Sequence, residues 1–192
     1  VHMNNAFRSS IPLILLLLLS SGCTSLPPIN FSAPNIGVSS TKLDAELKSL
    51  TVSIARPDEA TGEIDPAIGV HTGLWKTSLE EAFNRMAIFK DDSPRKVSLA
   101  VKILKLGVPR FGAGMTTHAS ARYEIIDRSD GSIIFTTDIS TTGDVPFDYA
   151  FTARVRLLES VNRSVQNNII QFLQVLETVD MDKPMFPSNK IN

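Results

Sequence analysis

The chain has 192 residues, and its 19 lysines and arginines nearly balance its 20 aspartates and glutamates. A net charge this close to zero gives no electrostatic reason to expect nucleic acid or an anionic membrane surface as a partner. Cys23 is the single cysteine, so no disulfide can form within the chain. A hydrophobic core must therefore stabilise the fold, and the length suits one ordinary domain.

The N-terminal segment is the most informative part of the sequence. Arg8 precedes an apolar run at residues 11–19, which is followed by the sequence SSGC at 20–23. This order is typical of a secretory signal peptide, and the run is shorter than the roughly 20 residues of a membrane-spanning helix. Small residues and a cysteine directly after a leucine run resemble the lipobox of bacterial lipoproteins. The resemblance implies that residues 1–22 are a signal peptide and that Cys23 becomes the acylated mature N-terminus; an incidental cysteine is the alternative.

The same resemblance implies where the protein is held. Lipid on Cys23 would be its one covalent group, with no other cofactor, and two or more acyl chains anchor a protein stably without a spanning segment. Thr24 stands where lipoproteins of the inner membrane often carry Asp, which implies the periplasmic face of the outer membrane. Residues 24–48, rich in serine, proline and asparagine, are interpreted as a flexible tether. A structured strand at 35–40 is the alternative.

Residues 49–179 are expected to form one α/β domain. Alternating apolar and polar residues at 50–54 predict its first core strand. A helix is predicted over residues 65–87, because Asp and Pro favour a helix start and an apolar stripe follows at helical spacing. Glycines weaken the first half of this helix, so Thr72 is an alternative start.

Three strands are predicted next. Residues 97–108 alternate, and their apolar face switches part-way, as a bulge or a twist onto a second apolar surface would require. Residues 117–126 and 133–139 form the other two strands, joined by a glycine-containing hairpin turn at 129–132. Residues 141–148 are expected to be a loop.

A final helix is predicted over residues 148–178, capped by Asp148, with Arg156 and Arg163 facing solvent. Residues 180–192 are expected to be a loose tail. The order β-α-β-β-β-α favours an α+β two-layer sandwich, in which an antiparallel sheet of three to four strands carries two helices on one face. Behind a lipobox, this arrangement resembles small domains of envelope lipoproteins, including the YajG-like group and auxiliary lipoproteins of envelope transport systems.

Catalytic motifs are not found in the sequence. His71 and His118 are far apart and have no cysteine beside them, so no metal site is expected. No serine stands in a Gly-x-Ser-x-Gly elbow, and no phosphate-binding glycine loop is present. We therefore expect a protein that is not an enzyme.

Two segments are candidates for binding a partner. The first is the loop at 108–115, where Arg110, Phe111 and Met115 are of residue types enriched at interface cores. The second precedes the final helix and contains Phe147 and Tyr149, the first two of three closely spaced aromatic residues. For both segments the alternative is that the apolar side chains pack into the core.

The sequence favours a non-catalytic lipoprotein, anchored in the outer membrane, that acts as an interaction or assembly module of the cell envelope. Its expected partners are the membrane, through the lipid anchor, and an envelope protein or a second copy of the chain. One alternative is a carrier of lipid or another small ligand, which would need a cleft between helices and sheet. A hydrolase centred on His71 or His118 is the other alternative.

Overall fold

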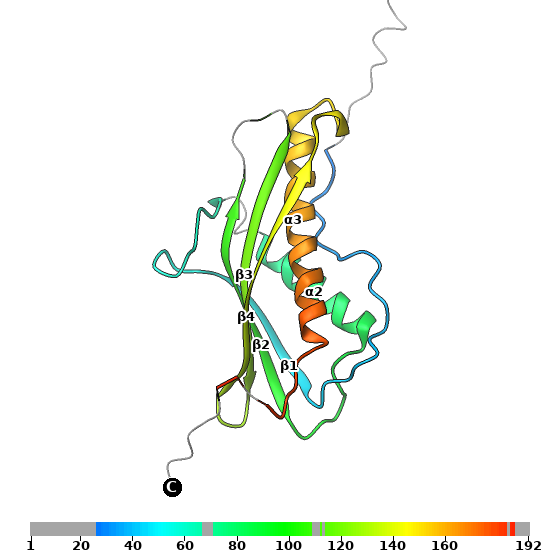
Figure 1. The fold of residues 1–192 in the computed structure, drawn as a ribbon, viewed down its shortest axis with the longest axis vertical. Helices are drawn as coiled ribbons and strands as arrows, with labels where there is room; N and C mark the ends of the chain where they lie inside the picture. The colour runs from blue at the N-terminus through cyan, green and yellow to red at the C-terminus, as the bar shows by residue number, and fades with distance from the viewer. Residues whose placement is uncertain (1–25, 67–70, 109–111, 113, 184, 187–192) are drawn as a thin grey trace, which may run out of the picture.

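The computed structural model describes residues 26–66, 71–108, 112, 114–183 and 185–186. One four-stranded sheet has the order β1-β2-β3-β4, and both long helices cover the same face of it (Figure 1). The predicted two-layer α+β fold is therefore confirmed. The elements in chain order are β1 (Glu46–Ile54), α2 (Thr72–Met86), β2 (Lys96–Gly107), β3 (Met115–Asp127), β4 (Ile133–Val145), the short 3-10 helix η4 (Phe147–Tyr149) and α3 (Ala153–Leu176).

The expectation of a wholly antiparallel sheet is wrong, because β1 pairs with β2 in parallel. The chain leaves β1, passes through α2 on the helical side, and returns to enter β2 in the same direction. Parallel neighbours need such a crossover connection, whereas the short turns elsewhere permit antiparallel pairing. The β2–β3 and β3–β4 pairs are antiparallel, as predicted.

The predicted switch of the apolar face in β2 is confirmed as a bulge. The register with β3 shifts between Ile103 and Lys105, so Leu104 is the extra residue. Ile103 and Leu104 are both 1% exposed although they are neighbours. The connection after β1 runs alongside β2 here, since the Thr61 amide donates to the Leu104 carbonyl. The bulge thus lets two consecutive side chains of one strand be buried.

Two element boundaries differ from the sequence prediction. β4 continues to Val145 through the expected loop at 141–148, because β3 extends far enough to pair with it. The final helix begins at Ala153, with Thr152 at its N-cap position, so Asp148 lies in η4 and does not cap it. The first long helix begins at Thr72, the later of the two starts considered.

The described segment before β1, from Leu26 onward, is not a free tether, and for these residues the interpretation of 24–48 as a flexible tether is wrong. Phe31, Ala33, Leu43 and Ala45 are each at most 3% exposed and belong to the core. Likewise, Met181 in the expected loose tail is 5% exposed. Isolated apolar residues in irregular segments lack the periodicity that identifies buried helices and strands, so the sequence did not reveal this packing.

The layer between the helices and the sheet is filled with side chains. The rings of Tyr123 and Phe172 stack with their centroids 3.9 Å apart, and both are fully buried. The Tyr123 hydroxyl donates to Asn168 Oδ1 at 2.8 Å, and burial raises the pKa of this phenol well above its ordinary value. A ligand cleft at this place would have to displace the core, so the packing gives the carrier alternative no support.

Candidate functional site

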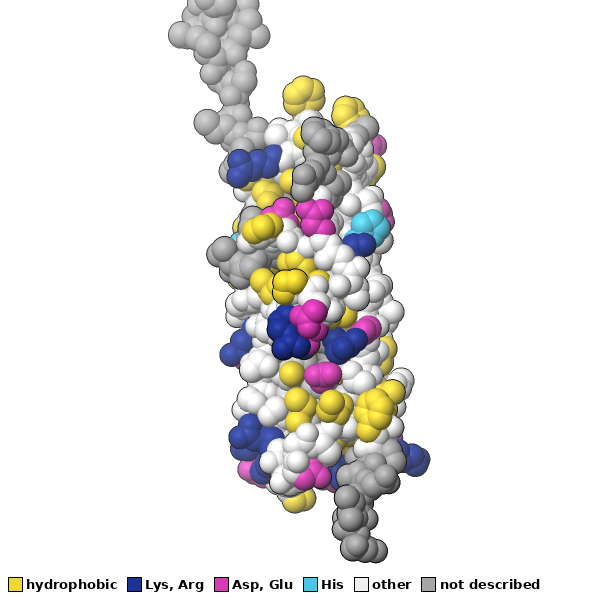
Figure 2. Space-filling view, turned by 90° about the vertical axis from the view of Figure 1, so that its left-hand side faces the viewer, with side chains coloured by type: hydrophobic (Ala, Val, Ile, Leu, Met, Phe, Trp, Pro, Cys, Tyr) yellow, Lys and Arg dark blue, Asp and Glu magenta, His cyan; other side chains and the backbone are white. Residues whose placement is uncertain are grey.

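An exposed aromatic cluster lies where β4 passes into α3. Phe147 and Tyr149 in η4 are 60% and 46% exposed, and Phe151 in the next turn is 99% exposed. These three residues, which we call the aromatic cluster, lie at the upper end of the molecule in Figure 1. Figure 2 shows hydrophobic side chains protruding at this end. Large apolar side chains rarely gather on a surface without a partner.

Two arginines of α3 hold this segment in place. Arg156 is only 3% exposed, and its guanidinium donates to the Ala150 and Phe151 carbonyls while lying 4.8 Å from the centre of the Phe147 ring. Arg163 lies 5.0 Å from the centre of the Tyr149 ring and donates to the Asp144 carbonyl.

The expectation that Arg156 faces solvent is therefore wrong. Its position on the helix suggested an exposed charge, but the preceding segment folds back over it and offers two carbonyls. Cation–π contacts and hydrogen bonds of this kind fix the backbone, so the three rings of the aromatic cluster are presented from an ordered support.

The start of the described chain is attached to α3 close to this cluster. Asn162 receives the Asn30 amide on Oδ1 at 2.9 Å and donates through Nδ2 to the Pro28 carbonyl at 3.2 Å. Gln166 Nε2 donates to the Asn30 carbonyl at 2.9 Å. Because Asn162 is only 6% exposed, losing these bonds would leave buried polar atoms without partners. The segment at residues 28–30 is therefore fixed to the helix.

The structure separates the predicted binding residues. Phe147 and Tyr149 are exposed, as a partner-binding role requires, whereas Met115 is 6% exposed and packs inside, so it offers no surface to a partner. Cys23, Arg110 and Phe111 lie outside the described residues. The exposure of Phe151 is decided by the tertiary structure, since nothing in the local sequence distinguishes this residue from an aromatic residue of the core.

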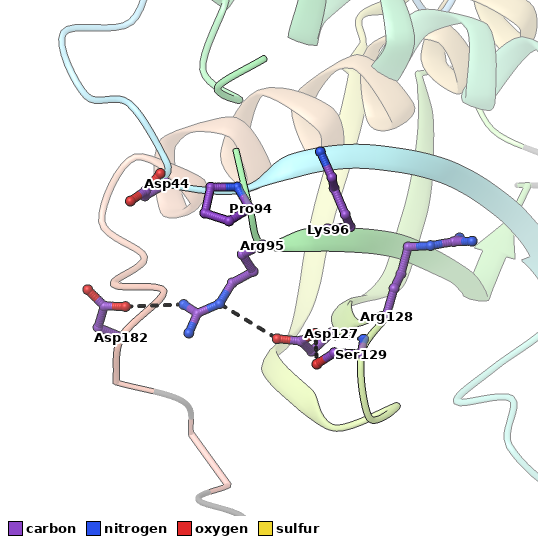
Figure 3. Close-up of a pocket in the computed structure, with 8 residues that line it drawn as sticks. All are labelled: Asp44, Pro94, Arg95, Lys96, Asp127, Arg128, Ser129 and Asp182. Carbon is purple, nitrogen blue, oxygen red and sulfur yellow. Dashed lines mark hydrogen bonds and ion pairs between the residues drawn. The ribbon is translucent and has the colours of Figure 1, made fainter. Parts of the chain in front are cut away.

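A charged cavity lies at the opposite end of the domain (Figure 3). It has a volume of about 610 Å³. Arg95 crosses it, with its guanidinium 3.6 Å from the Asp127 carboxylate and 3.2 Å from that of Asp182. Arg95 is thus already paired with two carboxylates of this cavity, and Arg128 in its lining donates to the hydroxyls of Ser49 and Ser98.

The two histidines lie on different sides of the sheet. On the helical side, the rings of His71 and Phe31 meet edge-on, with their centroids 6.4 Å apart. His118 is exposed on the open face beside Asp144, whose pKa is lowered by hydrogen bonds from the hydroxyls of Thr116 and then Thr142. The two cannot act together in one hydrolytic site.

No group of three or more metal-ligating side chains occurs within the described part of the chain. None of the helices described there is both long and apolar enough to cross a bilayer.

Comparison with known proteins assigns no family. No family model and no curated protein matches the chain. Among solved structures, a DUF330 protein from Xanthomonas campestris is 10% identical, with 80% of this chain and 96% of that chain covered and a TM-score of 0.49. A minor lipoprotein from Acinetobacter baumannii is 15% identical, with 77% and 99% covered and a TM-score of 0.42.

A third similar structure is the PelC dodecamer from Paraburkholderia phytofirmans. It is 13% identical, with 80% of this chain and 95% of that chain covered and a TM-score of 0.41. With TM-scores below 0.5, none of these similarities tells what the chain does, and the resemblance to the YajG-like group stays a prediction.

Proposed function

We propose that this chain is a lipid-anchored, non-catalytic protein of the bacterial envelope, held at the periplasmic face of the outer membrane, where it serves as an interaction or assembly module. The observation that carries the proposal is the signal-like run ending at Cys23, which is followed after only four residues by the segment fixed to α3. Anchor and folded domain are thus directly connected. Confinement at a membrane raises the effective concentration of such a domain near its partners.

The edge of the sheet at β1 is the surface best suited to a protein partner. The Ala55 amide donates to Ile103 in β2, and since amides alternate along a strand, those of Val52 and Ile54 point away from β2. At the other edge, α3 side chains already donate to the β4 carbonyls of Thr142 and Asp144. An open edge pairs with a strand from another chain, either a second copy or an envelope protein.

The proposal is tested in cells with a photo-crosslinking amino acid at Thr51, an exposed position of the open edge strand β1. The matched control is Ser140, an exposed hydroxyl residue of β4. We expect Thr51 to crosslink a second copy or one reproducible envelope protein, Ser140 to give no such product, and mass spectrometry to find acyl chains on Cys23 in outer-membrane fractions.

The two parts of the proposal fail separately. An unmodified Cys23 would remove the anchor. An acylated protein without a crosslink specific to Thr51 would contradict the assembly role.

A further inference from the structure

The length of chain between anchor and domain limits how far the domain can be from the membrane. Leu26, the first described residue, is three residues after Cys23. A fully extended chain spans at most about 3.6 Å per residue, so an acylated Cys23 keeps Leu26 within about 11 Å. Two residues further on, Pro28 is bonded to α3. The domain is therefore held against the bilayer and is not lifted away from it.

The same contacts decide which end of the domain faces the lipid. Asn162 and Arg163 are consecutive residues of α3, and they contact Pro28 and the Tyr149 ring, respectively. The described chain begins beside α3 at the end of the molecule that carries η4 (Figure 1). An anchor attached there brings the aromatic cluster toward the membrane and directs the charged cavity of Figure 3 away from it.

The chemistry of this end suits the interfacial layer of a bilayer. Tyrosine and tryptophan are enriched at membrane–water interfaces, where an apolar ring and a polar group both find partners, and this suits Tyr149. Phe147 and Phe151 add purely apolar rings of the kind that interfacial segments bury at the boundary of headgroups and acyl chains. Phe151 is 99% exposed in the isolated domain, and its ring would leave water on contact with lipid. Asp148 and Arg154 are exposed beside the cluster, so their charges offset each other. Attraction to lipid here depends on the rings rather than on net charge.

We propose that Phe147, Tyr149 and Phe151 insert into the headgroup layer of the membrane in which Cys23 is anchored, and that they fix the orientation of the domain on that membrane. The proposal rests on the lipid anchor proposed above. It assigns the two aromatic residues expected to bind a protein, Phe147 and Tyr149, to the lipid surface, and it leaves the β1 edge exposed to the periplasm for a protein partner.

The test compares two phenylalanines at opposite ends of the domain. The full-length acylated protein is reconstituted into phosphatidylethanolamine–phosphatidylglycerol vesicles that contain dibrominated phosphatidylcholine, a quencher of tryptophan fluorescence. One variant is Phe151→Trp. The matched control is Phe186→Trp, because Phe186 is 57% exposed and follows Met185, whose amide bonds to the start of β4. Wild-type protein supplies the background, since its single tryptophan, Trp75, is 1% exposed.

We expect the emission of Phe151→Trp to shift to the blue and to be quenched by the brominated lipid, while Phe186→Trp emits as in water and is not quenched. If the protein floats with the vesicles and carries acylated Cys23, but Phe151→Trp behaves like Phe186→Trp, the membrane-contact proposal is overturned and the anchor stands. An aromatic cluster that binds a protein rather than lipid would likewise leave Phe151→Trp unquenched on these vesicles. If Cys23 is unmodified and the protein does not float, the anchor fails and the contact proposal fails with it.

Discussion

Replacing Gly143 by Ala tests the closest approach between the sheet and α3. Gly143 lies in β4, and a Cβ atom added to it would be 2.1 Å from the Ser160 carbonyl oxygen and 2.4 Å from the Ser164 amide nitrogen. Both atoms belong to the backbone of α3, so no side-chain rotation can relieve the contact. The helix must move away from the strand by about 1 Å to restore normal van der Waals separation.

The cost of this movement follows from what α3 buries. Val161, Val165 and Ile169 line its inner face and are at most 5% exposed. A gap of 0.5–1 Å loses about a quarter to a half of the dispersion energy of each contact it opens. Overpacking of this kind costs about 1–3 kcal/mol, and a rigid backbone contact belongs at the upper end of that range. At about 3 kcal/mol, a domain of this size loses roughly 6–12 °C in Tm.

Thermal unfolding followed by circular dichroism measures this effect. Gly73→Ala is the matched control, because a Cβ at Gly73 would meet nothing within 4 Å. It lies near the start of α2, where alanine is the better helix former, so its Tm should be equal to that of the wild type or higher by about 2 °C. A Tm for Gly143→Ala within about 1 °C of the wild type would refute the close packing of β4 against α3.

Three further predictions concern buried and surface hydrogen bonds. Tyr123→Phe should lower the free energy of unfolding by about 1–3 kcal/mol in urea titrations, because the buried Asn168 Oδ1 loses its donor; an unchanged value would contradict this bond. Hydrogen bonds from Thr116 and Thr142 lower the pKa of Asp144 in the folded protein below 3.8, the ordinary value of an aspartate. The ionised carboxylate therefore stabilises the fold fully above pH 3.8, and this contribution is lost as the pH falls through the folded-state pKa. Acid unfolding of Asp144→Asn should therefore depend less on pH in that range, and identical profiles would exclude this contribution. Asn162→Ala should speed hydrogen exchange at the Asn30 amide, which donates to Asn162 Oδ1; unchanged protection would show that other contacts fix the segment.

The proposals together define an orientation for the protein. The end that carries η4 and Pro28 meets the membrane, while the sheet edge at β1 stays open to the periplasm. With Cys23 acylated, the few residues between it and Pro28 would make the domain a part of the membrane surface rather than a module on a long tether. Partners would therefore meet it close to the bilayer.

Patterns local in the chain were sufficient to predict most of the individual elements. The alternation in β2 predicted the strand, and its switch of apolar face at Leu104 marked the place where the structure has a bulge. The glycine-containing turn at 129–132 joins β3 and β4 as expected, with Gly131 at a φ of 75° that favours glycine. The apolar stripe of α3 fills the core with residues at helical spacing. Each of these signals depends on neighbours a few residues apart, and such spacing is directly visible in a sequence.

Features that depend on contacts between distant residues could not be predicted in the same way. The parallel direction of β1 follows from the path of the chain around the helical layer, and Phe31 is buried because it meets the Trp75 ring, 44 positions later in the sequence. Arg156 is buried because the segment before α3 folds back over it. The sequence by itself determined the apolar run ending at Cys23, the elements and the two-layer class, since these are set by composition and periodicity. Only the tertiary structure decided which aromatics remain exposed and which end of the domain carries the start of the described chain, because both result from packing between segments far apart in the chain.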